Sequence, residues 1–409
     1  MTIFAPIDAL TIGLDFGTEN VAVGRMAMQR GQAFFEFDTA FLERGLEISP
    51  FHLPLRQGLI RFDRNLFEGL AGVFYDSLPD GWGRLLLDRY ARSIGVNPGE
   101  ISNLQRLAHV GLGALTYMPD HSGDLPPEDI SLDQLADHAA QVLEGAAEEV
   151  LGQLIALNGS SAGARPKALI GVNEDQSDIC HGSQVLPQGY RRWIVKFSNM
   201  QDGDDAGAIE YVYALMAKAA GIEMPDVHLF PAQRGAGYFA IKRFDRDGTQ
   251  RYHMHTAGGL LHSDFRTPSL DYADLVTLTT SLCADQREVE KLFRLAVFNV
   301  LAHNRDDHAK NFSYLMDADG QWRFAPAYDL TFSSGPGGEQ STMVMGQGRD
   351  PDLDALFLLA HEAGIKKTDA KDVIDVVQGA LSQWNELSGV YGVRAQNRKL
   401  IADRIGRLA

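Results

Sequence analysis

Two polar side chains in the segment 303–311 constrain the fold of this chain more than any other feature of its sequence. The segment directly follows an apolar run over 292–302 that has the pattern of a buried helix, and a strand is predicted after it. Asp306 and Asn311 stand five positions apart in this polar loop. A carboxylate can accept a proton from a hydroxyl, and carboxylate and amide oxygens are ligands for Mg²⁺. Such a pair is common by chance, but its place at the end of a buried helix favours a functional loop.

Phosphoryl transfer from ATP needs few protein groups, and their order along protein kinases matches the order of the candidates here. Backbone amides must surround the phosphates, a lysine must neutralise them, oxygen ligands must hold Mg²⁺, and a carboxylate must accept the proton of the nucleophile. Asp306 and Asn311 have the spacing of the kinase catalytic aspartate and metal-binding asparagine. Asp329 lies at the end of a predicted hairpin over 312–330, where a kinase places its second metal ligand. A turn or cap is the alternative for Asp329, but the strand beside it would then bury an unpaired charge.

A loop of small residues over 158–167 is the candidate for phosphate binding. Its glycines, serines and alanines would let backbone amides approach a phosphate without obstruction. An ordinary Gly/Ser turn has the same composition, and the loop lacks the Gly-Lys-Ser/Thr sequence of a Walker loop. The phosphate interpretation therefore depends on the residues that follow it.

Lys196 supplies that support, because it lies in an apolar predicted strand, 191–197, on the same face as Ile194. A lysine in such a strand needs an anion, unless it reaches solvent at the edge of the sheet. The next predicted helix, 207–220, carries Glu210 where protein kinases place the carboxylate that pairs with this lysine. Lys196 and Glu210 are therefore a predicted ion pair beside the phosphates.

Two other motifs suggest different chemistry. Residues 12–18 contain Asp-Phe-Gly and resemble the first phosphate loop of actin-like kinases, but they precede the predicted catalytic loop and have no matching second phosphate segment. A Gly-containing hairpin is favoured there. His253, His255 and His262 with Asp264 suggest a metal site, but no further ligands with tetrahedral geometry are identified. Structural hydrogen bonding is favoured for these histidines.

Composition limits the class of function. The 409 residues carry 54 acidic and 37 basic side chains, a formal net charge of −17, so a large basic surface for nucleic acid is not expected. Cys180 and Cys283 are too few for a disulfide framework or a thiolate metal cluster, which is typical of a reducing compartment. The chain starts without a basic leader and has no apolar run of about 18 residues. We expect a soluble cytoplasmic protein with no membrane contact.

The strand and helix patterns predict an α+β fold in three parts, because the chain is too long for one ordinary domain. Residues 1–125 form the predicted N-terminal β-rich subdomain, which ends in a linker-like stretch at 119–127. Residues 126–245 and 246–409 are the predicted nucleotide-binding lobe and mostly helical catalytic lobe of a protein-kinase-like, two-lobed core. The predicted strands are 10–16, 21–28, 32–37, 113–118, 167–172, 191–197, 227–230 and 238–244, and the predicted helices include 82–95, 131–145, 146–157 and 207–220.

The candidate residues together resemble the HipA family, which are serine/threonine kinase toxins of bacterial toxin–antitoxin systems. The likeness covers most of the chain and rests on segments 78–81, 110–115, 160–167, 242–246, 306–311 and 328–330, together with Lys196.

The resemblance implies a role for each matching residue. Asp306 would be the catalytic aspartate, and Asn311 and Asp329 would hold Mg²⁺. Ser160 would be the self-phosphorylated serine, with Ser161 as the alternative. The residues implied to contact ATP are Ala162, Gly163, Ala164, Arg165, Pro166, Lys167, Lys196, Lys242, Arg243, Phe244, His308, Ala309, Lys310, Asn311, Tyr328 and Asp329. Among these, residues 242–244 would form the hinge beside adenine, although Lys242 stands where we expect a glutamate in the best-known members.

The resemblance also implies partners. These are a protein substrate such as an aminoacyl-tRNA synthetase, a small DNA-binding antitoxin that neutralises the kinase, and DNA only through that antitoxin. The segment 254–265 matches the family loosely, which leaves the target open.

Two other classes of function stay open. A small-molecule kinase of the aminoglycoside-phosphotransferase type shares the Asp-x-x-x-x-Asn loop, but it needs neither the N-terminal part nor the segment 165–167. A catalytically silent module could act as a corepressor with an antitoxin, but the complete set of catalytic candidates disfavours it.

Overall fold

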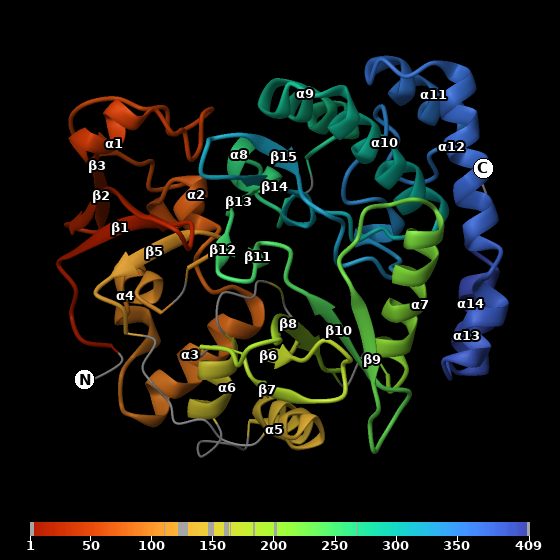
Figure 1. Ribbon diagram of the computed structural model, residues 1–409, viewed down its shortest axis with the longest axis horizontal. Coiled ribbons are helices and arrows are strands. Elements are labelled where there is room, and N and C mark those ends of the chain that lie inside the picture. The colour runs from red at the N-terminus through yellow and green to blue at the C-terminus, as the bar shows by residue number, and fades with distance from the viewer. Residues whose placement is uncertain are drawn as a thin grey trace.

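The computed structural model shows a mixed α+β fold with sheets in its N-terminal and middle parts and a mostly helical C-terminal part (Figure 1). The structure describes residues 4–109, 111–121, 130–145, 151–158, 163, 165–182, 185–199, 203–267 and 269–406. Within these ranges, no helix combines the length and the apolar character needed to cross a bilayer.

An antiparallel five-stranded sheet with the order β4-β3-β2-β1-β5 forms the N-terminal part. Its strands are β1 (Ala9–Asp15), β2 (Asn20–Gln29), β3 (Gln32–Phe37), β4 (Ile60–Arg61) and β5 (Leu115–Met118), and its short helices are α1 (Thr39–Arg44), α2 (Gly72–Tyr75) and α4 (Asn103–Leu107). Leu10, Ile12 and Leu14 alternate along β1 and are fully buried on one face. Gly17 turns the chain between β1 and β2 with a φ of 86°, so residues 12–18 form the Gly-containing hairpin that the sequence favoured.

A second antiparallel sheet, with the order β7-β6-β8-β10-β9, forms the middle of the molecule. Its strands are β6 (Lys167–Val172), β7 (Ile179–His181), β8 (Arg191–Lys196), β9 (Val227–Phe230) and β10 (Tyr238–Lys242), and the helices near it are α3 (Gly81–Ser93), α5 (Leu132–Glu144), α6 (Leu151–Asn158) and α7 (Ala206–Ala219). Trp193 and Val195 of β8 share a core with α3, α5 and α6. Ile194 points the other way, into a cluster with Ala214 of α7. One face therefore packs on three helices, and the face that carries Lys196 turns toward α7.

Helices dominate the C-terminal part, which contains the largest hydrophobic core among the described residues. The helices are α8 (Ala257–Leu261), α9 (Tyr272–Cys283), α10 (Gln286–Leu301), α11 (Leu353–Glu362), α12 (Lys367–Leu381), α13 (Trp384–Val390) and α14 (Ala395–Ala402), with short 3₁₀ turns at Phe67–Gly69, Pro98–Glu100, Ala309–Asn311 and Pro336–Gly338 elsewhere along the chain. The strands are the pair β11 (Arg246–Asp247) and β12 (Gln250–Arg251) and the sheet β13 (His253–Thr256), β14 (Ser313–Met316) and β15 (Trp322–Phe324). Figure 1 shows α12, α13 and α14 along the edge opposite the N-terminal sheet.

A buried polar seam joins the N-terminal part to β13. His255 Nδ1 lies 2.6 Å from Asp76 Oδ2, and its Nε2 lies 3.0 Å from Ser49 Oγ. Asp76 also accepts hydrogen bonds from Thr256 N and Thr256 Oγ1, each at 2.8 Å. His253 Nε2 lies 2.8 Å from the carbonyl oxygen of Ile48. The prediction of structural hydrogen bonding for His253 and His255 is confirmed.

The predicted strands and helices that fall within the described residues are present, and the structure adds several short elements that the sequence did not predict. One of these lies in the second sheet. No strand was predicted between 167–172 and 191–197, but Ile179–His181 form β7 at the edge of that sheet. Its pairing with β6 follows a turn at 173–178 whose polar side chains bond one another, such as Asn173 Nδ2 to Ser177 Oγ at 3.1 Å. The division of the chain at residues 125 and 245 stays a prediction.

Candidate active site

Lys196 at the end of β8 is held between two carboxylates. Its Nζ lies 2.5 Å from Glu210 Oε1 on α7 and also pairs with Asp329 Oδ1. Burial alone would lower the pKa of Lys196, but the charges of Asp329 and Glu210 outweigh burial and raise it. Burial would likewise raise the pKa of Asp329, yet Lys196 and Lys167 hold it well below its ordinary value. The predicted ion pair between Lys196 and Glu210 is therefore present, and Asp329 forms a second ion pair with the same lysine.

Asp329 reaches this position from an irregular segment that follows β15. Its φ of 54° lies in the left-handed region, which aspartate tolerates better than most residues. Such a backbone is retained where the surrounding structure fixes it, and it is common at functional sites.

Lys167 at the start of β6 stands directly opposite Lys196 in the register of β6 and β8. Burial lowers the pKa of Lys167, and the nearby charge of Lys196 lowers it further. The carboxylates of Asp329 and Asp80 act in the opposite direction but do not reverse the shift. Two lysines side by side repel each other, so the site has positive charge that an anion would stabilise.

Gly163, a residue of the predicted phosphate loop, lies over Lys167. A Cβ on Gly163 would stand 2.5 Å from Lys167 Nζ, and its φ is 112°. Only glycine fits this position without displacing the lysine. Arg165, two residues further along the chain, lies 3.6 Å from Glu210 Oε2 through its Nη1. Pro166 accepts a hydrogen bond from Phe197 N at 2.8 Å, which continues the β6–β8 ladder. Ser160, Ser161, Ala162 and Ala164 lie outside the described residues.

Asp80 links this loop to the catalytic-loop candidate. Gly163 N donates to Asp80 Oδ1 at 2.6 Å, and Lys310 Nζ donates to Asp80 Oδ2 at 2.6 Å. The carbonyl of Gly163 in turn accepts from Trp82 N at 3.0 Å. Burial would raise the pKa of Asp80, but Lys310 outweighs it and the pKa is lowered. Asp80 lies in the segment 78–81 that resembles the family, but the sequence alone assigned no role to it.

The predicted catalytic loop places Asp306 at an exposed rim and folds Asn311 back onto it. Asn311 Nδ2 donates to the backbone oxygen of Asp306 at 2.7 Å. Partial desolvation raises the pKa of Asp306; His308 opposes this shift and the charge of Asp329 adds to it. The ring of His308 lies 5.4 Å from that of Phe265 between centroids, and Ala309 is buried.

The neighbouring Asp307 is a structural residue that the sequence did not distinguish from Asp306. It is 1% exposed and accepts hydrogen bonds from Tyr272 Oη at 2.8 Å and from Ser341 N at 2.9 Å. Gln340 Nε2 and Thr342 N also donate to it, at 3.0 and 3.2 Å. Burial raises the pKa of Asp307 to about 7. Asp307 fixes the loop from inside and leaves Asp306 at the surface.

The predicted hinge, 242–244, is positioned mainly by Arg243. Its guanidinium makes two hydrogen bonds to Asp245, at 2.8 and 2.6 Å. Lys242 Nζ lies 3.5 Å from Asp226 Oδ2 on a partly exposed edge. The ring of Phe244 lies 5.4 Å from that of Tyr328 between centroids.

Tyr328 connects the hinge to the catalytic loop. Its hydroxyl donates to the backbone oxygen of Lys310 at 2.6 Å and lies 2.6 Å from Ser313 Oγ. Lys310 Nζ in turn stands 4.9 Å from the ring centroids of both Tyr75 and Phe265.

Chemically, this arrangement can hold a polyanion against Lys196 and Lys167. Asp329 and Asn311 offer oxygen ligands of the kind that Mg²⁺ prefers. Asp306 stands within the electrostatic reach of Asp329 and Lys196. Lys196, Glu210 and Asp329 are thus brought together by direct ion pairs, whereas the side chain of Lys242 pairs with Asp226.

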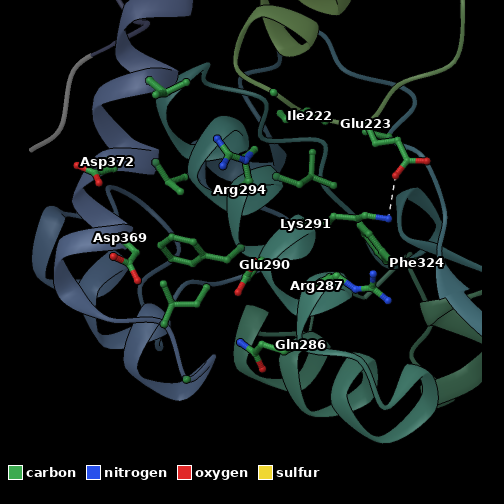
Figure 2. A pocket seen from close by; sticks show the side chains of 18 of the residues that line it. Ile222, Glu223, Gln286, Arg287, Glu290, Lys291, Arg294, Phe324, Asp369 and Asp372 are labelled. Atoms are coloured by element: carbon green, nitrogen blue, oxygen red, sulfur yellow. Dashed lines mark ion pairs between the residues drawn. The ribbon is translucent and has the colours of Figure 1, made fainter.

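A separate pocket of about 700 Å³ lies between α10, α12 and the loop before β9 (Figure 2). Lys291 pairs with Glu223 across it at 2.8 Å. Four basic and four acidic side chains line it, and none of the predicted site residues does.

Comparisons with known proteins cover both parts of the chain. Residues 159–384 match the family described as the HipA-like C-terminal domain, and residues 14–118 match the HipA N-terminal domain. A protein of Sinorhizobium fredii (strain NBRC 101917 / NGR234), named "Putative kinase Y4mE", is 26% identical over 379 residues, which are 84% of this chain and 84% of that protein.

Two solved structures match the chain to different extents. The HipA chain of the toxin–antitoxin complex of HipA, HipB and operator DNA from Shewanella oneidensis MR-1 has a TM-score of 0.66 and 16% identity, and the match covers 97% of this chain and 94% of that one. The proinflammatory kinase CtkA of Helicobacter pylori has a TM-score of 0.37 and 11% identity, over 53% of this chain and 88% of that one.

Proposed function

The chain belongs to the family of HipA-like proteins, and from this premise we propose that it is a toxin kinase that transfers the γ-phosphate of ATP to a serine or threonine of a protein. The observation that carries the proposal is the pairing of Lys196 with both Glu210 and Asp329. The two ion pairs bring together the second sheet, α7 and the segment after β15. An active kinase requires the same proximity of its lysine, its helix glutamate and its metal-binding aspartate.

ATP would bind with its phosphates beside Lys196 and Lys167. The loop 162–167 would lie against the phosphates, because Gly163 lies over Lys167 without a side chain to obstruct them. Adenine would lie against the hinge 242–244. The charge that ATP brings offsets the repulsion between the two lysines.

Mg²⁺ would be held by Asp329 and Asn311, and both residues fit this role. The pKa of Asp329 lies well below its ordinary value, so its carboxylate is charged and ready to act as a ligand. Asn311 uses its amide nitrogen to bond Asp306, which leaves its amide oxygen for a metal. The bound metal would neutralise charge on the phosphates during transfer.

Asp306 would orient the attacking hydroxyl and accept its proton. Partial desolvation and the charge of Asp329 raise its pKa, and a higher pKa makes a carboxylate a better proton acceptor as long as it stays ionised. Its exposed position at the rim leaves room for a protein segment as the substrate. His308 and Lys310 of the same loop would lie beside the phosphates.

A DNA-binding antitoxin is the proposed partner. The solved relative from Shewanella oneidensis is a complex of HipA with HipB and operator DNA. The net charge of −17 favours DNA contact through such a partner over direct contact. An aminoacyl-tRNA synthetase is the proposed type of substrate, and Ser160 the proposed site of self-phosphorylation.

Incubation of the purified protein and of a cell lysate with radiolabelled ATP and Mg²⁺ tests the proposal, with mass spectrometry of each labelled protein. Label should enter a serine or threonine of a lysate protein and Ser160 of the chain itself, and Asp306→Gln should abolish both. Label found only on small molecules, or on no product, would overturn the assignment as a protein kinase. Label on Ser161 alone would overturn only the role of Ser160.

A further inference from the structure

A cavity of about 1370 Å³ lies between the N-terminal sheet and the second sheet, and its lining is strongly basic. Six arginine or lysine side chains and two aspartates line it, whereas the pocket of Figure 2 has four bases and four acids. The basic residues of the cavity are Arg191, Arg192, Lys242, Arg243, Arg246 and Arg251. Such a concentration of positive charge is unexpected in a chain with a net charge of −17, and it favours an anion.

Three of these arginines are fixed in place by the fold. Arg243 pairs with Asp245 at 2.6 Å, and Arg251 pairs with Asp15 at 2.6 Å. Arg246 and Arg251 both donate to the backbone oxygen of Gly113, at 2.6 and 3.0 Å. Because a guanidinium has five donors in a rigid plane, the contacts of Arg246 and Arg251 leave other donors for a ligand.

The acids around the cavity do not balance its arginines. Burial lowers the pKa of Arg246 to about 9, against the charge of Asp245, and the other arginines add to the decrease. Burial also lowers the pKa of Arg192, with a further contribution from Arg243. In addition, Arg251 Nε is buried without a hydrogen-bond partner among the described residues. A buried donor without a partner is costly, and an anion would satisfy it.

We propose that this cavity binds a small ligand with two or more phosphate groups, at a site that adjoins the hinge at Lys242 and Arg243 but does not include Lys196 or Asp329. Arginine is well suited to phosphate, because its planar donors match two phosphate oxygens. The volume exceeds what one small anion needs and is ample for a drug-sized or nucleotide-sized molecule. Lys196, Asp306, Asn311 and Asp329 are not among its lining residues.

The position of the cavity gives the ligand a structural consequence. Its walls include the β1–β2 turn and β5 on one side, and β8 and the hinge residues Lys242 and Arg243 on the other. A bound polyphosphate would therefore contact both the N-terminal part and the hinge, and it would stabilise their contact.

Calorimetric titration of the full-length protein with inorganic pyrophosphate tests this site. Arg192→Gln and Arg251→Gln should each weaken binding at least about tenfold, the loss expected when one charge-assisted hydrogen bond to phosphate is removed. Lys291→Gln, in the pocket of Figure 2, is the matched control and should bind as the wild type does. Lys196→Ala should retain binding at the arginine cavity.

Two outcomes of the titration would overturn the proposal. One is the absence of pyrophosphate binding to the wild type, and the other is binding that Lys196→Ala removes and the arginine variants leave intact, which would place the anion in the catalytic cleft. If an arginine variant fails to fold, arginine modification of the wild type decides. Arginine modification by phenylglyoxal, mapped by mass spectrometry, should be slower at Arg192 and Arg251 when pyrophosphate is present, and equal rates would refute the site. None of these results depends on the protein being a kinase.

Discussion

Replacement of Asp80 by asparagine tests whether the N-terminal part holds the phosphate loop in place. The carboxylate uses one oxygen for Gly163 N and the other for Lys310 Nζ, each at 2.6 Å. Asparagine has the same shape but only one acceptor oxygen, so one of these donors must lose its partner. The Lys310 side chain is only 9% exposed, and water can replace the lost bond there only in part.

The burial of the two donors determines how much stability and ATP affinity the variant should lose. A buried donor left unsatisfied costs about 1–3 kcal/mol, so Asp80→Asn should destabilise the protein by about 2 kcal/mol. If Lys310 keeps the amide oxygen, the loop at Gly163 is released and must be ordered again when ATP binds. A loss of about 1.4 kcal/mol from that step weakens ATP–Mg²⁺ binding tenfold.

Asp88→Asn on the same helix is the matched control. Asp88 pairs with the buried Arg106 at 2.9 Å, and neither residue is among the predicted site residues. Both variants should lower the thermal midpoint, but only Asp80→Asn should raise the Kd for ATP–Mg²⁺ in calorimetry. Equal Kd values in the two variants would show that Asp80 contributes stability alone, and the positioning argument would be refuted.

Three further predictions concern the catalytic loop and its metal ligands. Asp306→Gln should bind ATP–Mg²⁺ as the wild type does, while its rate of phosphate transfer in the radiolabel assay falls about 10²–10⁴-fold; a wild-type rate would remove Asp306 as the proton acceptor. Asp329→Ala should weaken the dependence of ATP affinity on Mg²⁺, because only Asn311 then remains as a ligand, and calorimetry that finds the dependence unchanged would exclude Asp329 as a ligand. Burial raises the pKa of Asp307 to about 7, so the folded protein keeps a proton that the unfolded chain releases near pH 4, and stability should fall as pH rises between about 4 and 7. Asp307→Asn should flatten this part of the curve of thermal midpoint against pH, and an unchanged slope in the variant would contradict the assignment.

Local sequence patterns were sufficient to predict most of the elements that carry the site. Lys196 was placed correctly because apolar alternation in β8 assigns each side chain to one face of the sheet. Glu210 followed from the periodicity of α7, and β6 and β9 have the predicted bounds. The short β7 was missed, because three residues, two half-buried and one buried, have too little pattern to distinguish a strand from a loop.

Contacts between distant segments could not be predicted in the same way. Asp80 lies 83 positions from Gly163 and 230 from Lys310, and no periodicity connects residues at such separations. Asp306 and Asp307 are adjacent acids in one polar loop, and only the packing of Tyr272 and Ser341 around the second shows which one is buried. The arginines of the cavity come from several strands, so their convergence requires the folded chain.

The seam of Ser49, Asp76 and His255 limits how this protein can change by recombination. Asp76 accepts three hydrogen bonds from His255 and Thr256, and every partner is buried, so a mismatch on either side leaves polar groups that water cannot reach. A chimera that joins the N-terminal part of one relative to the core of another therefore needs matched residues across this seam. Among relatives, residues 49 and 76 are expected to change together with residue 255, although about 180 positions or more separate them in the sequence.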